Sequence, residues 1–218
     1  MMSALPWYLL LLPFFAAVVI VLFTKSSPGL SSFISVAAVL GSFVCSCLVF
    51  ATPNIQTLEL TWIDLRPVLY VPLGFVLDDL TKTMLVLVTG IGALIHVYSL
   101  GYMRDDSGKS RYFAALSFFM FSMLGIVVSN NFVMMFIFWE LVGVSSYLLI
   151  GHWFERDAAA EAAKKAFLTN RIGDFGFMLG ILMAWAATGS VVFSEMNQQL
   201  GRITSYPLPC KSLPPSAT

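Results

Sequence analysis

The sequence is dominated by runs of about twenty apolar residues, and this feature limits the fold more than any other. Of the 218 residues, 58% are hydrophobic and only 11% are charged, whereas a soluble domain carries about 25% charged residues. An apolar helix needs roughly 20 residues to cross a bilayer, and inside the lipid it must satisfy its own backbone hydrogen bonds. The sequence therefore predicts an all-α, polytopic transmembrane protein.

We expect about six membrane spans, over residues 5–23, 32–51, 80–103, 111–129, 132–152 and 166–188. Pro13 is expected to kink the first span, and Asp79 to cap the third. Between the fourth and fifth spans, Asn130 and Asn131 leave room only for a tight turn, so these spans should be antiparallel neighbours. Apolar and polar residues alternate from Leu58 to Ile63, which predicts a strand and hence a short β-hairpin over 57–77, outside the lipid.

The basic residues predict how the spans are oriented. An N-terminus on the outer side places seven of them on the inner side: Lys25, Arg104, Lys109, Arg111, Arg156, Lys164 and Lys165. The outer side then holds Arg66 and Lys82 before the tail. Because loops on the cytoplasmic or matrix side carry the excess of Lys and Arg, we expect an integral membrane protein with an outer N-terminus.

Composition also divides the chain and excludes some functions. Residues 1–110 hold three spans and the hairpin, residues 111–190 hold the next three spans, and residues 197–218 carry four prolines. This last segment is expected to be an irregular tail, disordered or truncated.

The formal net charge is zero and no basic tail is present, so nucleic-acid binding is not expected. The absence of a glycine-rich nucleotide motif and of a cysteine cluster predicts that this chain binds no redox cofactor, nucleotide or metal.

Glu140 is the residue that least fits its surroundings, because it lies near the middle of the span over 132–152. An acidic residue at the centre of a span costs roughly 2.5–3.5 kcal/mol of insertion free energy. One interpretation is a neutral carboxylic acid that hydrogen-bonds to a neighbouring helix. The interpretation we favour is a proton site, since burial favours the protonated form of a carboxyl group and a nearby cation favours the ionised form. Gly143 and Tyr147 lie along the same helical stripe and predict a packed interior face.

The last expected span contains a second anomaly. Its uncharged part, Phe175 to Thr188, has only 14 residues, so a crossing helix must begin near Ala166 and include Arg171 and Asp174. These two residues are three apart, share a helix face and can neutralise each other. A structural ion pair and a charge relay both remain open.

Other polar groups in the spans are sparse. His96, in the third span, is expected to make hydrogen bonds or to belong to an internal path for protons; a role as haem ligand is not expected. No lysine lies near the middle of any expected span. Glu140 is therefore expected to lack a cationic partner within this chain.

Three motifs resemble the large antiporter-like membrane subunit of respiratory complex I, which is NADH:quinone oxidoreductase subunit L or chain 5. They are W-E-L-V-G-V-S-S-Y-L-L-I-G at 139–151, K-A-F-L-T-N-R-I-G-D at 165–174 and H-V-Y-S-L-G-Y-M at 96–103. The resemblance extends from the N-terminus to about residue 200. It implies that Glu140 is a key protonatable residue, that Arg171 and Asp174 are the charged pair of the sixth span, and that His96 belongs to the histidine motif of the third.

The resemblance also implies a function. The chain would be a membrane subunit of a translocase that moves protons as electrons pass from NADH to quinone. Its partners would be the other membrane subunits of complex I. The NAD, FMN, iron–sulfur clusters and quinone would reside in other subunits. The membrane would be the inner membrane of a bacterium or of a mitochondrion.

Members of this family have many more spans, arranged as two inverted five-helix repeats with lysines near the midplane. The resemblance therefore implies that this sequence is an N-terminal fragment or a truncated gene product. Two alternative functions remain. One is a subunit of a multi-subunit sodium/proton antiporter, and the other is a non-transporting remnant or scaffold whose charges only pair helices.

Overall fold

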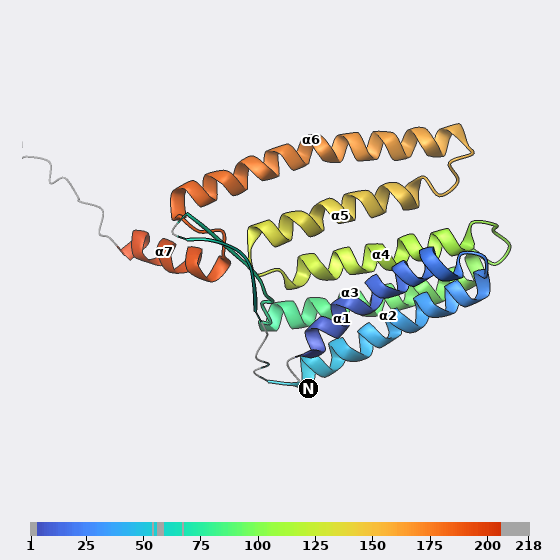
Figure 1. The fold of residues 1–218 in the computed structure, drawn as a ribbon, viewed down its shortest axis with the longest axis horizontal. Helices are drawn as coiled ribbons and strands as arrows, with labels where there is room; N and C mark the ends of the chain where they lie inside the picture. The colour runs from blue at the N-terminus through green and yellow to red at the C-terminus, as the bar shows by residue number, and fades with distance from the viewer. Residues whose placement is uncertain (1–3, 54, 56–58, 67, 206–218) are drawn as a thin grey trace, which may run out of the picture.

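The computed structural model describes residues 4–53, 55, 59–66 and 68–205, in which the helices form an antiparallel bundle (Figure 1). The helices are α1 (Leu5–Val19), its π-helical continuation η2 (Ile20–Thr24), α2 (Pro28–Ala51), α3 (Asp79–Tyr102), α4 (Lys109–Val128), α5 (Phe132–Ile150), α6 (Asp157–Thr188) and α7 (Phe193–Ser205). Five helices in the described part are long and apolar enough to cross a membrane: α1 together with η2, and α2 to α5. These confirm the first five expected spans, and α1 runs through Pro13 without a break.

The sixth expected span lies within α6, which begins at Asp157 instead of near residue 166. With 32 residues, α6 is about 48 Å long at 1.5 Å per residue, more than the roughly 30 Å thickness of the hydrocarbon core. Charged residues, among them Arg171 and Asp174, lower its hydropathy, and it is not one of the five apolar helices. It lies alongside α5 (Figure 1). A sixth crossing therefore stays a prediction.

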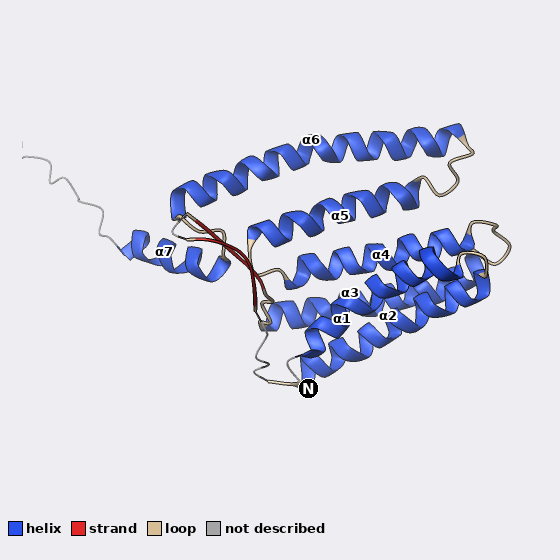
Figure 2. Cartoon of the chain, viewed as in Figure 1, coloured by secondary structure: helices blue, strands red, loops and turns tan. Residues whose placement is uncertain are grey.

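The β-hairpin expected over 57–77 is confirmed. Strands β1 (Leu60–Leu65) and β2 (Leu69–Leu73) pair antiparallel and are drawn red in Figure 2. The Arg66 guanidinium beside Asp64 lowers the pKa of this exposed carboxyl group. The hairpin lies at the end of the bundle where α4 turns into α5.

Asn131 connects this hairpin to the bundle. Its side-chain oxygen accepts a hydrogen bond from the Met134 amide at 2.8 Å and so caps α5, as an asparagine at this position is expected to do. Its Nδ2 donates to the carbonyl of Pro72, in β2, at 2.7 Å. The predicted tight turn at Asn130 and Asn131 is confirmed, and its second residue also holds the hairpin.

Helix α3 is capped by Asp78, so the expectation that Asp79 caps it is wrong by one residue. The Asp78 carboxylate accepts from the Thr81 amide at 2.7 Å. Hydrogen bonds from the Thr81 hydroxyl and amide lower the pKa of Asp78. Asp79 is instead the first residue inside the helix, where its charge favours the positive end of the helix dipole.

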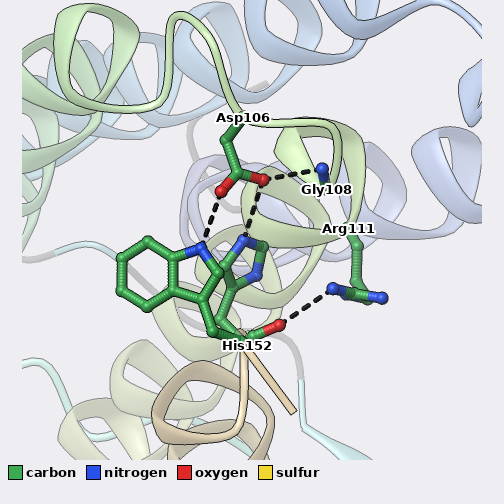
Figure 3. Close-up of polar contacts among 5 residues, drawn as sticks. Asp106, Gly108, Arg111 and His152 are labelled. Carbon is green, nitrogen blue, oxygen red and sulfur yellow. Dashed lines mark hydrogen bonds and ion pairs between the residues drawn. The ribbon is translucent and has the colours of Figure 1, made fainter. Parts of the chain in front are cut away.

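At the opposite end, which we call the basic end, residues 25–27, 103–108 and 151–156 connect the helices. The seven basic residues expected on the inner side lie in these connections or near the starts of α4 and α6. Asp106 joins two of the connections (Figure 3). Its carboxylate accepts hydrogen bonds from Trp153 Nε1 at 2.7 Å, Gly108 N at 2.6 Å and His152 Nε2 at 3.3 Å. Arg111 Nη2 donates to the His152 carbonyl at 2.8 Å.

Helix α4 is central to the bundle, since it packs against α1, α2, α3 and α5. Hydroxyl groups connect buried helix faces: Ser35 and Ser117 are 2.7 Å apart, and Ser46 and Thr89 are 2.8 Å apart. Such interhelical bonds favour association in lipid, where apolar contacts alone add little. Because α4 contacts helices on both sides of residue 110, the division of the chain at that residue stays a prediction.

Helix α7 corrects part of the expectation for the tail. Residues 197–205, which we expected to be irregular, belong to α7, while residues 206–218 lie outside the described part. Met196, Gln198 and Gln199 are good helix formers, and Glu195 in the first turn complements the helix dipole. The four prolines of the tail all come after Ser205, so none of them interrupts the described part of this helix.

Candidate functional site

The candidate site lies between the middle parts of α5 and α6. Glu140 is about 12 Å along α5 from Phe132 and about 15 Å from Ile150 at 1.5 Å per residue. Arg171 and Asp174 lie on α6, which packs against α5. The structure therefore brings together three of the four predicted site residues.

Arg171 contacts both carboxylates. Its Nη1 forms an ion pair with Glu140 Oε2, across the two helices. The same nitrogen lies 3.5 Å from Asp174 Oδ2, on its own helix. The carboxylates are well covered, with exposed side-chain fractions of 21% for Glu140 and 10% for Asp174, while the Arg171 side chain is 37% exposed.

This arrangement corrects one expectation. Glu140 was predicted to lack a cationic partner because no lysine lies near a midplane. Arg171 is that partner. The contact between Arg171 and Asp174 that their spacing predicted is also present. Which face of α6 points at α5 depends on how the helices are rotated, so the interhelical pair could not be read from spacing within one helix.

Two aromatic residues position the charges. Trp139 Nε1 donates a hydrogen bond to Asp174 Oδ1 at 2.9 Å. The Arg171 guanidinium lies over the Phe167 ring, 4.7 Å from its centroid, in a cation–π contact. Sequence reasoning missed Trp139, although it directly precedes Glu140. Its indole N–H points across to α6, so Asp174 is held by a donor from the helix that carries Glu140.

The cluster contains two carboxylates and one guanidinium. A guanidinium keeps its proton throughout the physiological pH range. When both carboxylates are ionised, the cluster has a net charge of −1, and one proton on either carboxylate makes it neutral. The arrangement can therefore bind and release one proton.

The predicted packed stripe around Glu140 is wrong in part. An added Cβ at Gly143 would meet no atom within 4 Å, so this glycine does not allow a close helix approach. The close approach of α4 and α5 is at Gly125, where a Cβ would overlap the Phe138 ring. Tyr147 faces α6, with its ring 5.5 Å from that of Phe167.

His96 is separate from the charge cluster, on α3 against α4. It is fully buried, and its Nδ1 lies 2.8 Å from the Gly92 carbonyl. Because a carbonyl only accepts, Nδ1 carries the hydrogen, and Nε2 has no partner among the described residues. His96 also lines a cavity of about 190 Å³ whose other lining residues are apolar. The expected hydrogen bond is present, and a role in a proton path stays a prediction.

Two segments of the chain match known families. Residues 62–113 match the family described as NADH-ubiquinone oxidoreductase (complex I), chain 5 N-terminus. Residues 129–208 match the transmembrane family described as NADH:quinone oxidoreductase/Mrp antiporter. The second segment contains the whole Glu140–Arg171–Asp174 cluster.

Curated relatives carry consistent names. The chain is 46% identical over 180 residues to NAD(P)H-quinone oxidoreductase subunit 5, chloroplastic, of Mesostigma viride, covering 80% of this chain and 27% of that protein. It is 51% identical over 136 residues to NAD(P)H-quinone oxidoreductase chain 5 of Synechocystis, covering 62% of this chain and 20% of that protein. The chain thus spans about a quarter of the length of the curated relatives that it matches.

Two solved structures have a similar fold. One, described as the Mrp complex from Dietzia, aligns with a TM-score of 0.71 at 25% identity, over 88% of this chain and 20% of that chain. The other, the membrane-bound sulfane sulfur reductase, an archaeal respiratory membrane complex, aligns with a TM-score of 0.73 over 90% of this chain and 40% of that chain. At 15% identity it supports the fold alone. By its helices, its matched segments and its relatives, this chain belongs to the family of antiporter-like membrane subunits that includes chain 5 of NADH:quinone oxidoreductase.

Proposed function

We propose that this chain contributes a proton-binding site to a proton-translocating NADH:quinone oxidoreductase. The observation that carries the proposal is the ion pair between Arg171 and Glu140, in the middle of two packed helices, with Asp174 next to it. The names of the relatives supply the reaction class. Electron transfer takes place in other subunits, and this chain moves protons.

Arg171 is the charge that can shift between the two acids. When Glu140 binds a proton, its attraction for the guanidinium falls, and Asp174, whose Oδ2 is 3.5 Å away, becomes the better partner. A guanidinium that moves toward Asp174 leaves Glu140 without its cation, which favours the protonated state. Release of the proton restores the first pair. A charge that changes in a neighbouring subunit can drive this exchange electrostatically.

Glu140→Gln in the complete enzyme tests the proposal. Glutamine has nearly the same shape and cannot bind or release the proton. We expect fewer protons translocated per electron in reconstituted vesicles, with electron transfer from NADH to quinone still measurable. The matched control is Glu161→Gln, which changes the same side chain at an exposed position on α6. An unchanged ratio of protons to electrons in Glu140→Gln would reject the assignment.

A multi-subunit sodium/proton antiporter is the second candidate, since one solved relative is a Mrp complex and the second matched family includes such antiporters. Sequence identity favours the oxidoreductase. The chain is 46% identical to the oxidoreductase subunit of Mesostigma viride but 25% identical to the matched chain of the Mrp complex from Dietzia. The two differ in their coupling ion. Sodium-driven proton exchange in vesicles that lack NADH-dependent electron transfer would favour the antiporter, and proton movement that requires NADH oxidation would favour the oxidoreductase.

We further propose that other membrane subunits of this enzyme surround the chain, that the NAD, FMN, iron–sulfur clusters and quinone are held outside it, and that its basic end faces the inner side. The membrane is the inner membrane of a bacterium or mitochondrion. The basic residues gathered at one end support this orientation. An impermeant thiol reagent should label Asp105→Cys only from the inner side and Asp64→Cys only from the outer side, in a cysteine-free background. The reverse pattern would overturn the orientation.

A further inference from the structure

A cavity of about 730 Å³ opens at the basic end, between α1 with η2, α4, α5 and α6. This volume is within the range of about 300–1,000 Å³ that ligand pockets occupy. Most of its lining is aliphatic or aromatic and includes Phe14 and Phe118. The charge cluster of the proposed function does not line it.

The polar lining is confined to one end of this cavity. Lys25 follows η2, Arg111 is in the first turn of α4, and Lys164 is near the start of α6. From Arg111 to Phe118 the cavity extends along α4 for about 10 Å at 1.5 Å per residue. The cavity is therefore apolar toward the middle of the bundle and cationic at its rim, which is the polarity of a lipid with an anionic head group.

The cations at the rim have no acidic partner among the residues that the structure describes. None of Lys25, Arg111 and Lys164 belongs to an ion pair among the described residues. The acids Glu155, Asp157 and Glu161 are close in sequence but do not line the cavity. Arg111 Nη2 donates a hydrogen bond to the His152 carbonyl. Because a guanidinium has five N–H donors, Arg111 can still donate hydrogen bonds to an anion.

Ser110 is a second, independent sign of a ligand. Ser110 is only 5% exposed and lines the cavity. Its Oγ has no hydrogen-bond partner among the described residues. Buried hydroxyl groups are almost always hydrogen-bonded. The Oγ atom itself is covered in this structure, so a phosphate oxygen at the rim would accept this hydrogen bond after the Ser110 side chain rotates toward the cavity.

We propose that this cavity binds one phospholipid with an anionic head group from the leaflet at the basic end. The phosphate lies at Ser110, Lys25, Arg111 and Lys164, and an acyl chain enters the apolar part toward Phe118. Basic pockets between membrane helices on the cytoplasmic or matrix side bind anionic head groups in this way. The site does not depend on the proposed proton translocation.

Photo-labelling tests the proposal on the protein purified in its natural membrane assembly and reconstituted in nanodiscs. Two probes carry the same photoactivatable acyl chain, one on phosphatidylglycerol and one on phosphatidylcholine. We expect phosphatidylglycerol to label the cavity-lining peptides of α1 and α4 roughly ten-fold more than phosphatidylcholine, and the difference to shrink at high salt. Equal labelling by the two lipids would overturn the proposal, as would cross-links from the cavity to another polypeptide.

Two double variants separate the site from general surface charge. Lys25→Gln with Lys164→Gln removes two rim cations, while Lys109→Gln with Lys165→Gln removes the same charge from neighbouring residues that do not line the cavity. We expect the first pair to abolish the preference for phosphatidylglycerol and the second to retain it. Ala160→Leu, at a half-buried lining position, should reduce labelling by both lipids. An equal loss of preference in both double variants would refute a specific site.

Discussion

At the scale of single residues, the most important feature is one guanidinium shared by two carboxylates. Arg171 pairs with Glu140 on the facing helix and with Asp174 on its own. Trp139 holds the second oxygen of Asp174, so this acid has a fixed hydrogen-bond donor that Glu140 lacks among the described residues. Among the described residues, Glu140 is therefore the acid of the cluster that is held by Arg171 alone.

Arg171→Gln should leave two adjacent carboxylates without their cation. Like charges this close cannot both stay ionised, so one of them should hold a proton at neutral pH. Infrared difference spectroscopy should detect this as a new carbonyl band of a protonated carboxyl group, and the band should be absent from the Glu140→Gln, Arg171→Gln double variant. Arg66→Gln, whose partner Asp64 is exposed at the hairpin turn, is the control without a band. Arg171→Gln without a new band would contradict the shared-cation arrangement.

At the scale of helices and their connections, polar side chains in the turns hold the two ends of the bundle together. At one end, Asn131 caps α5 and binds the hairpin. At the other, Asp106 joins the connection before α4 to the one before α6. These contacts tie the connections before α4, α5 and α6 to neighbouring segments of the chain.

Asn131→Ala should remove both functions of this side chain. Loss of a helix cap costs about 1 kcal/mol, and an unpaired buried Pro72 carbonyl adds about 1–3 kcal/mol. We expect the free energy of unfolding in detergent to fall by about 2–4 kcal/mol. Asn131→Ser keeps a cap oxygen but loses the amide donor, so its cost should be intermediate. Equal stability of the serine variant and the natural protein would show that the bond to Pro72 contributes nothing.

Because of Asp106, we expect the free energy of unfolding to depend on pH in the acid range. Burial opposes its ionisation, but hydrogen bonds from Trp153, the Gly108 amide and His152 outweigh this and hold the pKa of Asp106 below its usual value. The stability that the ionised form contributes is then complete above the pKa of the unfolded chain, about 3.9, and is lost as pH falls through the lower folded-state pKa. Asp106→Asn should cost about 1–2 kcal/mol above pH ~7.

The same variant and the natural protein should converge in stability below about pH 4. Chemical unfolding at several pH values measures the difference. His152 also contacts Asp106, so His152→Gln serves as a control for the loss of this contact. A difference that grows on acidification below about pH 4 would contradict the assignment.

At the scale of the whole molecule, α4 organises the bundle, because α1, α2, α3 and α5 all pack on it. The contact between α4 and α5 depends on Gly125, where the Phe138 ring occupies the space of a side chain. In lipid, helices associate through such close packing and through interhelical hydrogen bonds. The position of α5, and with it Glu140, therefore depends on one small residue of α4.

Gly125→Ala and Gly143→Ala make the same substitution at a packed and at an open position, and so test how far the α4–α5 contact depends on Gly125. At Gly125 the new methyl group overlaps the Phe138 ring, and overpacking of this kind costs about 1–3 kcal/mol. At Gly143 the space is open, so the better helix propensity of alanine should leave stability unchanged or raise it by up to about 1 kcal/mol. Thermal unfolding of both variants in detergent measures this. Equal destabilisation would show that the α4–α5 contact does not depend on Gly125.

Local sequence signals were sufficient for the five apolar helices, the hairpin and the turn at Asn130 and Asn131. The reason is that a membrane helix satisfies its backbone within itself, so apolar length alone decides where it forms. Glu140 was found for the same reason, because a charge inside such a run is visible without any neighbour. The start of α6 at Asp157 and the helix over 193–205 were harder, since polar segments outside the lipid carry no hydropathy signal.

The partners of these side chains depend on tertiary structure. How far each helix is rotated about its axis, and how far it is shifted along its neighbour, decides that Arg171 meets Glu140, that Trp139 reaches Asp174 and that Gly125 receives Phe138. The cavity with its cationic rim likewise combines residues from four separate segments. These contacts join residues far apart along the chain, and hydropathy or spacing within a single helix carries no information about them.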